Sequence, residues 1–226
     1  MSPSAVVASG FVAVNITFRN TVGANSGQAV ALRSGANLSA FYNCFSKDTK
    51  TPYILTPCDN STEKCDIYGT VDFIFGNAAV VLQECKIYPR LPLYGQFNAI
   101  TAQGRTDLNQ NTGTSIQNCT IDLGTTKTYL GRPWKEYSRT VFMQSFMDSL
   151  IDPSGWHEWS GDDYLTTLYY AEFDNRGPGS DTSNRVTWPG YHVIDATDAV
   201  NFAVSIFIQG DSWLPATGVP FDAGLL

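Results

Sequence analysis

The segment Leu82-Gln83-Glu84-Cys85-Lys86-Ile87 follows an apolar, β-prone run, and its pattern returns several times along the chain. Similar phrases occur at Val14-Asn15-Ile16-Thr17-Phe18, Phe41-Tyr42-Asn43-Cys44 and Ile116-Gln117-Asn118-Cys119-Thr120-Ile121. Each phrase reads as the same strand on a different turn of a coil, because such self-similarity is typical of solenoid proteins. The sequence therefore predicts an all-β fold, a parallel β-helix.

The cysteines give the length of one turn of this coil. Cys44, Cys65 and Cys85 are separated by 21 and 20 residues, which suits one circuit with equivalent side chains stacked on successive turns. Neighbouring turns lie about 4.8 Å apart, within the roughly 4.4–6.8 Å between Cα atoms that a disulfide tolerates. We predict a disulfide between Cys65 and Cys85, with stacked free thiols as the alternative.

A loop is expected to leave the coil between Cys85 and Cys119, where the spacing grows to 34 residues. The segment Pro89-Arg90-Leu91-Pro92-Leu93-Tyr94-Gly95 lies in this interval, and loops of this kind tend to carry function.

The C-terminal part of the chain departs from the strand pattern. Asp195 or Thr197 can cap a short helix before Ala199–Ile206, which would pack against the coils. His157 and His192 are the only histidines, and neither sits in a pattern typical of a catalytic triad or a metal site. We expect both histidines to be structural.

Composition favours a single folded domain over residues 1–226. The chain of 226 residues is 43% hydrophobic and 15% charged, so it can bury a sizeable core. Its 19 glycines and 11 prolines favour a turn-rich, all-β architecture. The net charge of −7 argues against nucleic acid or an anionic membrane as a partner. An acidic polysaccharide would have to be held by local contacts.

The sequence gives two opposing indications of location. Met1-Ser2-Pro3-Ser4 has no basic region and precedes only a short apolar stretch, so we expect neither a signal sequence nor a transmembrane run here. Five cysteines and four glycosylation sequons, at Asn15, Asn37, Asn60 and Asn118, instead fit a secreted protein.

A single carboxylate lies inside the apolar run Tyr68-Gly69-Thr70-Val71-Asp72-Phe73-Ile74-Phe75-Gly76-Asn77-Ala78. We expect Asp72 to be partly buried, because the residues around it are β-prone and apolar. A carboxylate withdrawn from water either holds a charge partner or has its pKa raised, and both arrangements recur where catalysis needs a nucleophile or base. An aspartate in a structural turn is the alternative.

A second run, Tyr129-Leu130-Gly131-Arg132-Pro133-Trp134-Lys135-Glu136-Tyr137-Ser138-Arg139-Thr140, supplies a partner for Asp72. The guanidinium of Arg132 can pair with that carboxylate, and the indole of Trp134 is suited to stacking on a sugar ring. Together with Gly27-Gln28-Ala29-Val30-Ala31-Leu32-Arg33, these runs resemble the signature segments of plant-type pectinesterases (pectin methylesterases). The runs follow the family's order, and the resemblance covers nearly the whole chain.

The resemblance implies a right-handed parallel β-helix with a short C-terminal helix. The family's catalytic domain normally begins well before the first residue of this chain, so we expect residues 1–226 to be a catalytic domain lacking its N-terminal coils. An open first coil would expose strand edges and favour aggregation unless something caps it.

The resemblance also implies hydrolysis of galacturonate methyl esters in pectin, which leaves pectate and releases methanol. In this mechanism a carboxylate attacks the ester, amide side chains hold the oxyanion, and a second acid protonates the methoxide. By resemblance Asp72 is the nucleophile, Arg132 orients it and Gln28 donates to the oxyanion. Trp134 and Phe75, with Gln28 and Arg132, would contact the substrate.

Further expectations follow from the resemblance. It implies no cofactor and no metal. The expected partners are pectin (homogalacturonan) and a proteinaceous pectinesterase inhibitor, the expected state is a monomer, and the expected location is extracellular, in the cell wall.

One signature run of the family is missing. The family's acid and second oxyanion glutamine come from a Tyr-Gln-Asp-Thr-Leu-Tyr run between the equivalents of Cys44 and Cys65, and here the proton donor would fall near Thr51. Plausible codons for Ser46 to Lys64, read from the third base of each codon, restore Gln-Asp-Thr-Leu-Tyr. We hypothesise that residues 45–64 are translated out of frame, in a real allele or an erroneous gene model.

The substituted interval has consequences for activity and fold. Loss of a general acid costs roughly 10²–10⁴ in rate and loss of an oxyanion donor about 10²–10³, so the chain as written should be nearly inactive. Asp48 is the only acid near the right place, and Pro52 and Pro57 are expected to interrupt a central strand.

Three alternatives remain open from the sequence. The first is a pectin-binding protein without turnover. The second, a β-helical pectate lyase or polygalacturonase, is disfavoured because no Ca²⁺-binding carboxylate cluster surrounds Asp72. The third is a purely structural, secreted β-helix.

Overall fold

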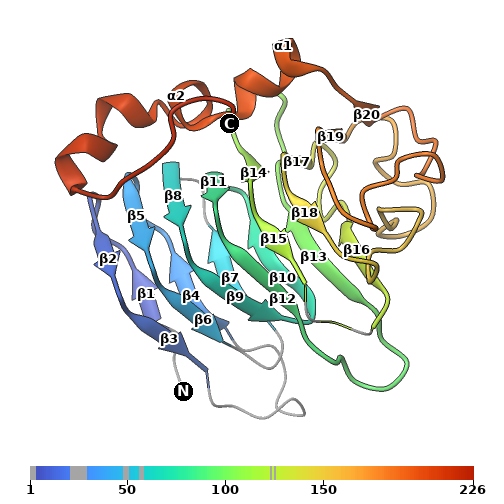
Figure 1. The fold of residues 1–226 in the computed structure, drawn as a ribbon, viewed down its shortest axis with the longest axis horizontal. Coiled ribbons are helices and arrows are strands. Elements are labelled where there is room, and N and C mark those ends of the chain that lie inside the picture. The colour runs from blue at the N-terminus through green and yellow to red at the C-terminus, as the bar shows by residue number, and fades with distance from the viewer. Residues whose placement is uncertain (1–3, 21–29, 48–50, 56–58, 123, 125) are drawn as a thin grey trace.

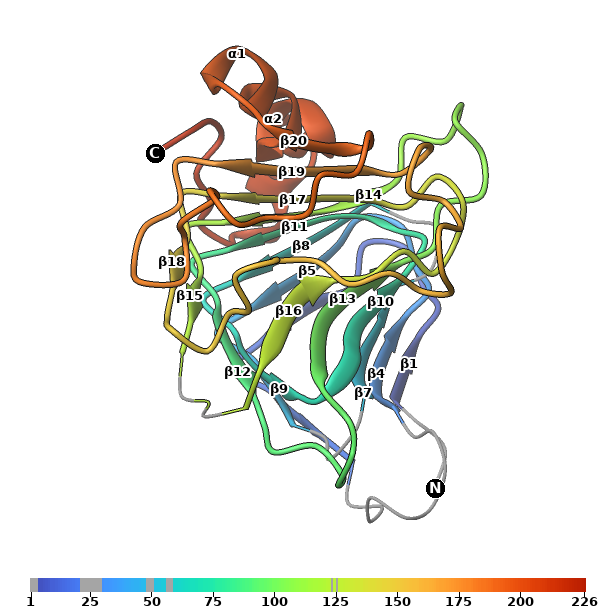
Figure 2. The same ribbon diagram turned by 90° about the vertical axis from the view of Figure 1, so that its right-hand side faces the viewer.

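The computed structural model describes residues 4–20, 30–47, 51–55, 59–122, 124 and 126–226, with the backbone alone for residues 51–55 (Figure 1). Three parallel sheets form the body of the molecule and face one another around a common core (Figures 1 and 2). No helix in these ranges is long and apolar enough to cross a membrane.

Each coil passes through the three sheets in turn. Sheet A has six strands, in the order β1 (Ser4–Val6), β4 (Val30–Ser34), β7 (Thr51–Leu55), β10 (Val71–Gly76), β13 (Asn98–Gln103) and β16 (Thr128–Gly131). Sheet B has eight, in the order β2 (Val12–Val14), β5 (Ser39–Tyr42), β8 (Asp59–Glu63), β11 (Ala79–Gln83), β14 (Gly113–Gln117), β17 (Arg139–Met143), β19 (Tyr169–Phe173) and β20 (Tyr191–Val193). Sheet C has six, in the order β18 (Phe146–Met147), β15 (Thr120–Ile121), β12 (Lys86–Pro89), β9 (Asp66–Gly69), β6 (Phe45–Lys47) and β3 (Thr17–Arg19).

The repeated sequence phrase marks the corner between sheets B and C. At this corner one residue per coil has a left-handed backbone, with φ between 48° and 58°: Asn15, Asn43, Lys64, Glu84, Asn118 and Gln144. Asparagine tolerates this conformation better than most residues, which explains why it recurs in the phrase. The predicted parallel β-helix is therefore confirmed, and the repeat that predicted it is a turn motif.

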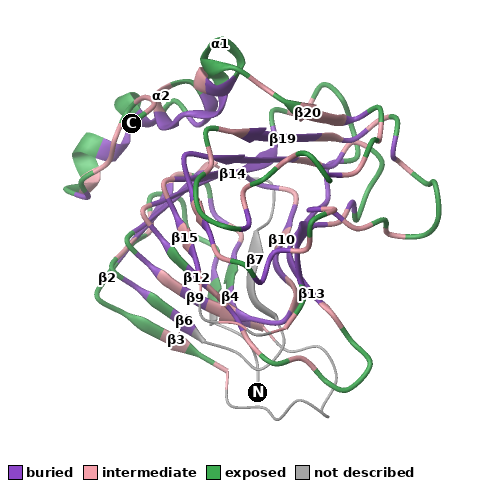
Figure 3. Ribbon diagram, turned by 45° about the vertical axis from the view of Figure 1, so that its right-hand side comes forward, coloured by how far each residue is buried: buried purple, intermediate pink, exposed green. Residues whose placement is uncertain are grey.

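The core lies between the three sheets, where side chains of equal register stack on successive coils. In sheet B, Phe41, Thr62, Leu82, Ile116 and Phe142 pair in sequence and are all buried. Figure 3 shows buried residues concentrated on the strands, whereas exposed residues follow the loops, the C-terminal helices and the first-coil strands β2 and β3. Such stacking removes apolar surface from water along the whole coil.

Helical segments cover the outer face of sheet B, but they are shorter than predicted. Asp195 caps α1 (Ala196–Ala199) by accepting hydrogen bonds from the backbone N–H groups of Thr197 and Asp198, at 2.8 and 3.2 Å. Thr197 is not the cap. The chain continues through η1 (Val200–Phe202), α2 (Val204–Phe207), η2 (Gly210–Ser212) and η3 (Leu214–Thr217). The single helix that we predicted is broken because Ala203 has an extended backbone, with ψ of 160°.

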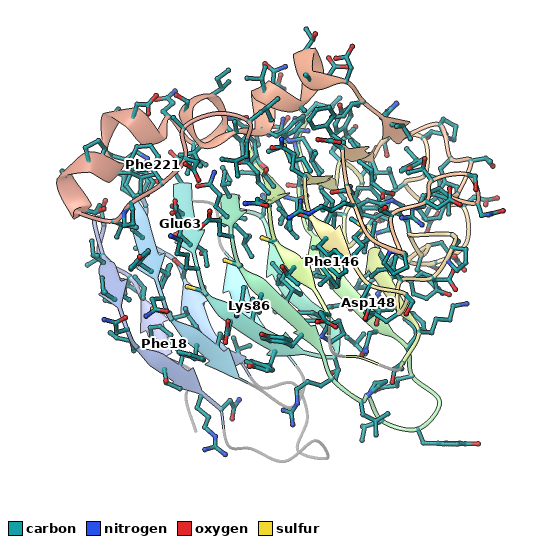
Figure 4. The ribbon with its side chains drawn as sticks, viewed as in Figure 1. Phe18, Glu63, Lys86, Phe146, Asp148 and Phe221 are labelled. Carbon is teal, nitrogen blue, oxygen red and sulfur yellow. The ribbon has the colours of Figure 1, made fainter. Side chains whose placement is uncertain are left out.

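The cysteines stack as predicted, but the predicted disulfide between Cys65 and Cys85 is not formed. Cys44, Cys65, Cys85 and Cys119 are buried free thiols on successive coils, and Figure 4 shows sulfur atoms following one another across neighbouring strands. Each sulfur lies near backbone carbonyl oxygens; Cys85 Sγ, for example, is 3.3 Å from the oxygen of Thr62. Burial raises the pKa of the Cys85 thiol well above its ordinary value, so it stays protonated.

Two further expectations about the substituted interval are corrected. Pro52 lies within β7, a strand paired on both sides, so it does not interrupt sheet A. The pairing with β4 joins Thr51 to Val30 and Tyr53 to Leu32 and passes over Pro52, and the pairing with β10 begins at Tyr53, so the missing N–H leaves only a local gap in the ladder. Asn60 belongs to a sequon, but it is fully buried and accepts a hydrogen bond from Ser34, so it is closed to glycosylation in the folded chain. Asp48 and Pro57 lie outside the described residues.

Candidate active site

Asp72 and Arg132 form a two-point ion pair, as the sequence predicted. Arg132 Nε donates to Asp72 Oδ1 at 2.8 Å, and Nη2 donates to Oδ2 at 2.6 Å. The side chains retain 18% and 20% of their exposure, so a ligand can still reach them. This bidentate geometry fixes both carboxylate oxygens and is stronger than a neutral hydrogen bond.

The backbone of β10 turns Asp72 out of the regular strand. Asp72 has a left-handed conformation with φ of 54°, and the pairing register between β10 and β13 shifts between Val71 and Ile74. A bulge of this kind re-aims a side chain, and it is common next to active sites. The strain of a non-glycine residue at positive φ is consistent with a functional constraint at this position.

Arg132 is placed by the end of β16, the next strand but one from β10 in sheet A. Its backbone N–H donates to the oxygen of Thr101 at 3.0 Å. A Cβ atom added at Gly131 would lie 2.0 Å from Thr101 Oγ1, so only glycine allows the two strands to approach this closely. In the Gly131-Arg132 pair of the sequence motif, the glycine thus allows the two strands to approach and the arginine holds Asp72.

Aromatic rings flank the guanidinium of Arg132, and the sequence did not predict this. The guanidinium carbon lies 4.3 Å from the ring centroid of Trp159 and 5.5 Å from that of Phe97. His157 stacks on Phe97 with a centroid distance of 4.3 Å. Trp159 reaches the site because the backbone N–H of His157 donates to the oxygen of Gly131.

Trp134 lies beside the ion pair as an exposed platform. Its indole keeps 36% of its exposure and meets the ring of Phe75 edge-on at 5.9 Å between centroids. A Cβ atom added at Gly104 would lie 2.8 Å from Trp134 Cε3, so glycine makes room for the indole. The structure therefore brings Asp72 and Phe75, on β10, together with Arg132 and Trp134, which follow β16 in the same sheet.

Two predicted participants cannot be placed by their side chains. Gln28 lies outside the described residues, and Thr51 is described by its backbone alone. Position 51 lies on β7, the strand next to β10 in sheet A, where Tyr53 pairs with Ile74. The bulge of β10 between Val71 and Ile74 interrupts this register, so it places Thr51 on the strand adjacent to that of Asp72 without assigning it a partner on β10.

The site has the components of carboxylate-based chemistry. In the described part of the chain, no group of three or more His, Cys, Asp or Glu side chains is arranged to hold a metal ion. The site instead offers one oriented carboxylate, a fixed cation and an exposed indole. A carboxylate held in this way can serve as a nucleophile or a base.

Comparison with known proteins identifies the family. Residues 2–211 match the Pectinesterase family. The chain belongs to the pectinesterase family. A carrot pectin methylesterase superimposes with a TM-score of 0.96 at 52% identity, covering 98% of this chain and 72% of the other. The Aspergillus niger pectin methylesterase gives a TM-score of 0.80 at 32% identity, covering 93% and 67%.

Curated pectinesterase relatives are longer than this chain. Probable pectinesterase/pectinesterase inhibitor 7 of Arabidopsis thaliana is 62% identical over 98% of the chain but only 40% of its own length. Pectinesterase 2 of Citrus sinensis is 56% identical over 98% of the chain and 45% of its own length. The chain thus spans less than half the length of these relatives.

Proposed function

We propose that this pectinesterase-family chain is a carboxylic ester hydrolase that removes methyl esters from pectin to give pectate and methanol. The observation that carries the proposal is the two-point pair of Arg132 with Asp72 beside the exposed indole of Trp134. The matching carrot and Aspergillus niger proteins are pectin methylesterases by name, which supports the same substrate here.

In the proposed mechanism a carboxylate oxygen of Asp72 attacks the ester carbonyl carbon and forms an acyl-enzyme. Arg132 holds the carboxylate so that an oxygen faces the substrate, and Trp134 supports the sugar ring. Gln28 would donate to the developing oxyanion. Methoxide leaves as methanol after protonation, and water then cleaves the acyl-enzyme and frees Asp72.

The chain as written has no acidic side chain at position 51, where the family's proton donor is expected. The sequence has Lys50-Thr51 where the family pattern has Gln-Asp, and we propose that residues 45–64 are translated out of frame. Sequencing the transcript across these codons tests the idea directly. A base change that restores Gln-Asp-Thr-Leu-Tyr supports it, and a transcript that encodes the chain as written overturns it.

Methanol release from highly methyl-esterified pectin tests the enzymatic proposal. We expect the double variant Lys50→Gln, Thr51→Asp to release methanol at least about 10²-fold faster than the chain as written, because a general acid and an oxyanion donor return. Adding Asp72→Asn should abolish that release while the circular dichroism spectrum stays unchanged. Release that persists after Asp72→Asn would contradict the assigned nucleophile.

We further propose that the protein acts outside the cell, in the cell wall, as a monomer, and that a proteinaceous pectinesterase inhibitor is a partner. Support for the inhibitor comes from the Arabidopsis relatives, whose names combine pectinesterase with pectinesterase inhibitor. Titration of methanol release with such an inhibitor, followed by size-exclusion chromatography of the mixture, tests this partner.

A further inference from the structure

A pocket of about 710 Å³ opens on the outer face of sheet C, away from the Asp72–Arg132 pair. Tyr68, Tyr88, Arg90, Asp122 and Asp148 contribute to its lining. Figure 4 labels Asp148 beyond the end of β18, at the edge of sheet C. Among the catalytic candidates that the structure describes, neither Asp72 nor Arg132 lines this pocket, so it is separate from their ion pair.

The side chains of the pocket come from equivalent positions on successive coils. Tyr68 pairs with Tyr88, Ile87 pairs with Ile121, and Ile121 pairs with Met147. Asp122 follows Ile121, and Asp148 follows Met147. The two aspartates therefore continue the column that Tyr68 and Tyr88 begin. The isoleucines and methionine are buried in the core, and the residues that alternate with them face outward.

One end of this column is aromatic. The rings of Tyr68 and Tyr88 are stacked, with 4.4 Å between centroids and 23° between planes. Both tyrosines are partly exposed, so the stack offers apolar surface with a hydroxyl group on each ring. An amphipathic wall of this kind matches a sugar ring, which has apolar C–H faces and polar edges.

The other end of the column is acidic. The carboxylates of Asp122 and Asp148 can accept hydrogen bonds from hydroxyl groups, and Arg90 adds one cation to the same pocket. Two carboxylates against one guanidinium leave the pocket negative, in a chain whose net charge is already −7. A ligand that carries a carboxylate on every sugar would be repelled.

We propose that this pocket is a second binding site, which takes a short uncharged, hydroxyl-rich sugar segment and excludes the demethylated, anionic chain. The preference for an uncharged sugar rests on the pocket alone. The choice of methyl-esterified galacturonan as the ligand rests on the proposed function. A neutral polysaccharide such as a galactan also presents uncharged, hydroxyl-rich sugars, so it is the other ligand that this pocket could take.

The loop between β12 and β13 connects the two sites. Its first residues, Arg90 and Leu91, line the pocket, and its last, Phe97, lies against the guanidinium of Arg132. The predicted excursion from the coil is thus part of both sites. A pectin chain held at the pocket would be kept close to the esterase site before its ester groups are removed and released from the pocket afterwards.

Calorimetric titration with three oligosaccharides tests the proposal: a methyl-esterified galacturonan, its demethylated form and a neutral galactan. The protein is the full chain carrying Asp72→Asn and Trp134→Ala, so that turnover and binding at the indole platform are removed. We expect binding of at least one uncharged oligomer, and about tenfold weaker binding after Tyr88→Leu, because the stacked ring is lost. Asp148→Asn should also weaken the binding of the uncharged oligomer. The melting temperature of each variant reports whether the fold persists.

Tyr94→Ala is the matched control, because Tyr94 is a fully exposed aromatic in the same loop and does not line the pocket. Galactan binding alone would identify the neutral polysaccharide as the source and still support the site. Uncharged binding that is unchanged by both Tyr88→Leu and Asp148→Asn, or pectate binding of equal strength, would overturn the proposal. Binding retained here, together with no methanol release from the separate chain that carries Lys50→Gln and Thr51→Asp, would count only against the proposed esterase function.

Discussion

Arg132 is the residue on which the candidate site depends most, because it contacts both a charge and two rings. Its guanidinium carbon lies 4.3 Å from the Trp159 centroid, and the same group holds Asp72 at two points. A cation above an indole is attracted by about 1–2 kcal/mol when partly desolvated. Trp159 is therefore a positioning residue, acting on Asp72 through Arg132.

Replacing Trp159 with a non-aromatic side chain of similar bulk should weaken catalysis. We expect Trp159→Leu, in the chain that already carries Lys50→Gln and Thr51→Asp, to lower kcat/KM for methanol release by about five- to thirtyfold. Trp159→Phe keeps a ring and should recover most of the loss. Equal activity of the two variants, at equal melting temperature, would show that the ring contact with Arg132 does not matter.

Glu63 makes the stability of the chain depend on pH. Burial raises the pKa of its carboxyl from 4.5 to about 8, and the nearby Asp222 and Glu84 add to the effect, whereas Ser61 opposes it. Between pH 4.5 and about 8 the folded chain keeps a proton that the unfolded chain has lost. The free energy of unfolding should therefore fall with rising pH, by at most about 1.4 kcal/mol per pH unit.

Denaturant unfolding of Glu63→Gln at pH 5 and pH 8 checks this expectation. The amide cannot ionise, so the variant should lose less stability than the parent chain between the two pH values. Glu158→Gln, at an exposed position, serves as the control. An unchanged difference between pH 5 and pH 8 in Glu63→Gln would assign the pH dependence to another group.

At the scale of elements, strand β8 stands out because all five of its residues are polar and four of them are buried. Thr62 stacks between Phe41 and Leu82, and it lines a small cavity with Phe18, Leu32 and other core residues. Thr62 thus stands where the coils on either side place larger apolar side chains. This is what a segment read in the wrong frame would leave in an otherwise apolar core.

A larger apolar side chain at this position should stabilise the fold. We expect Thr62→Leu to raise the free energy of unfolding by about 1 kcal/mol, because it fills the cavity and buries additional apolar surface. The control Thr62→Ser keeps the hydroxyl and removes a methyl group, so it should be destabilising by about 1 kcal/mol. A destabilising Thr62→Leu in denaturant unfolding would mean that the cavity cannot accept the side chain.

The sequence predicted the coil, because the left-handed corner requires similar residues once per turn and so leaves a visible repeat. It also predicted the pairing of Asp72 with Arg132, which lie 60 residues apart. The contact of Trp159 with Arg132 could not be predicted, because Trp159 lies in an irregular segment that is placed by a parallel bridge between Gly131 and Trp156. The break at Ala203 was missed because alanine favours helices and only tertiary packing sets its extended backbone there.

On the scale of the whole molecule, the C-terminal tail ties three successive coils together. Gln83, Gln117 and Gln144 form a ladder of side-chain amides along sheet B and its corner, with Gln83 Nε2 donating to Gln117 Oε1 at 2.9 Å. The tail lies along this ladder. Gln83 donates to the backbone oxygen of Asp222 and accepts from its N–H, and Gln117 donates to the oxygen of Gly224 at 2.8 Å. Gln144 likewise donates to the backbone oxygen of Leu226 and accepts from its N–H.

Removing the middle rung should loosen the tail and the coils together. We expect Gln117→Ala to lower the free energy of unfolding by about 1–3 kcal/mol, since buried partners on both sides lose a hydrogen bond. Hydrogen exchange at residues 222–226 should become faster in the same variant. Gln96→Ala, at an exposed glutamine of the loop after β12, is the control. Unchanged exchange in the tail would show that the ladder does not hold it.

The column of buried thiols gives each coil its own internal reporter. Cys44, Cys65, Cys85 and Cys119 are at most 4% exposed, and the pKa of Cys44 is raised by its hydrogen bond with Cys65 and by burial. A thiol in that state does not react with alkylating reagents until its coil opens. The order in which the four cysteines become labelled in dilute denaturant would therefore show from which end the solenoid unravels.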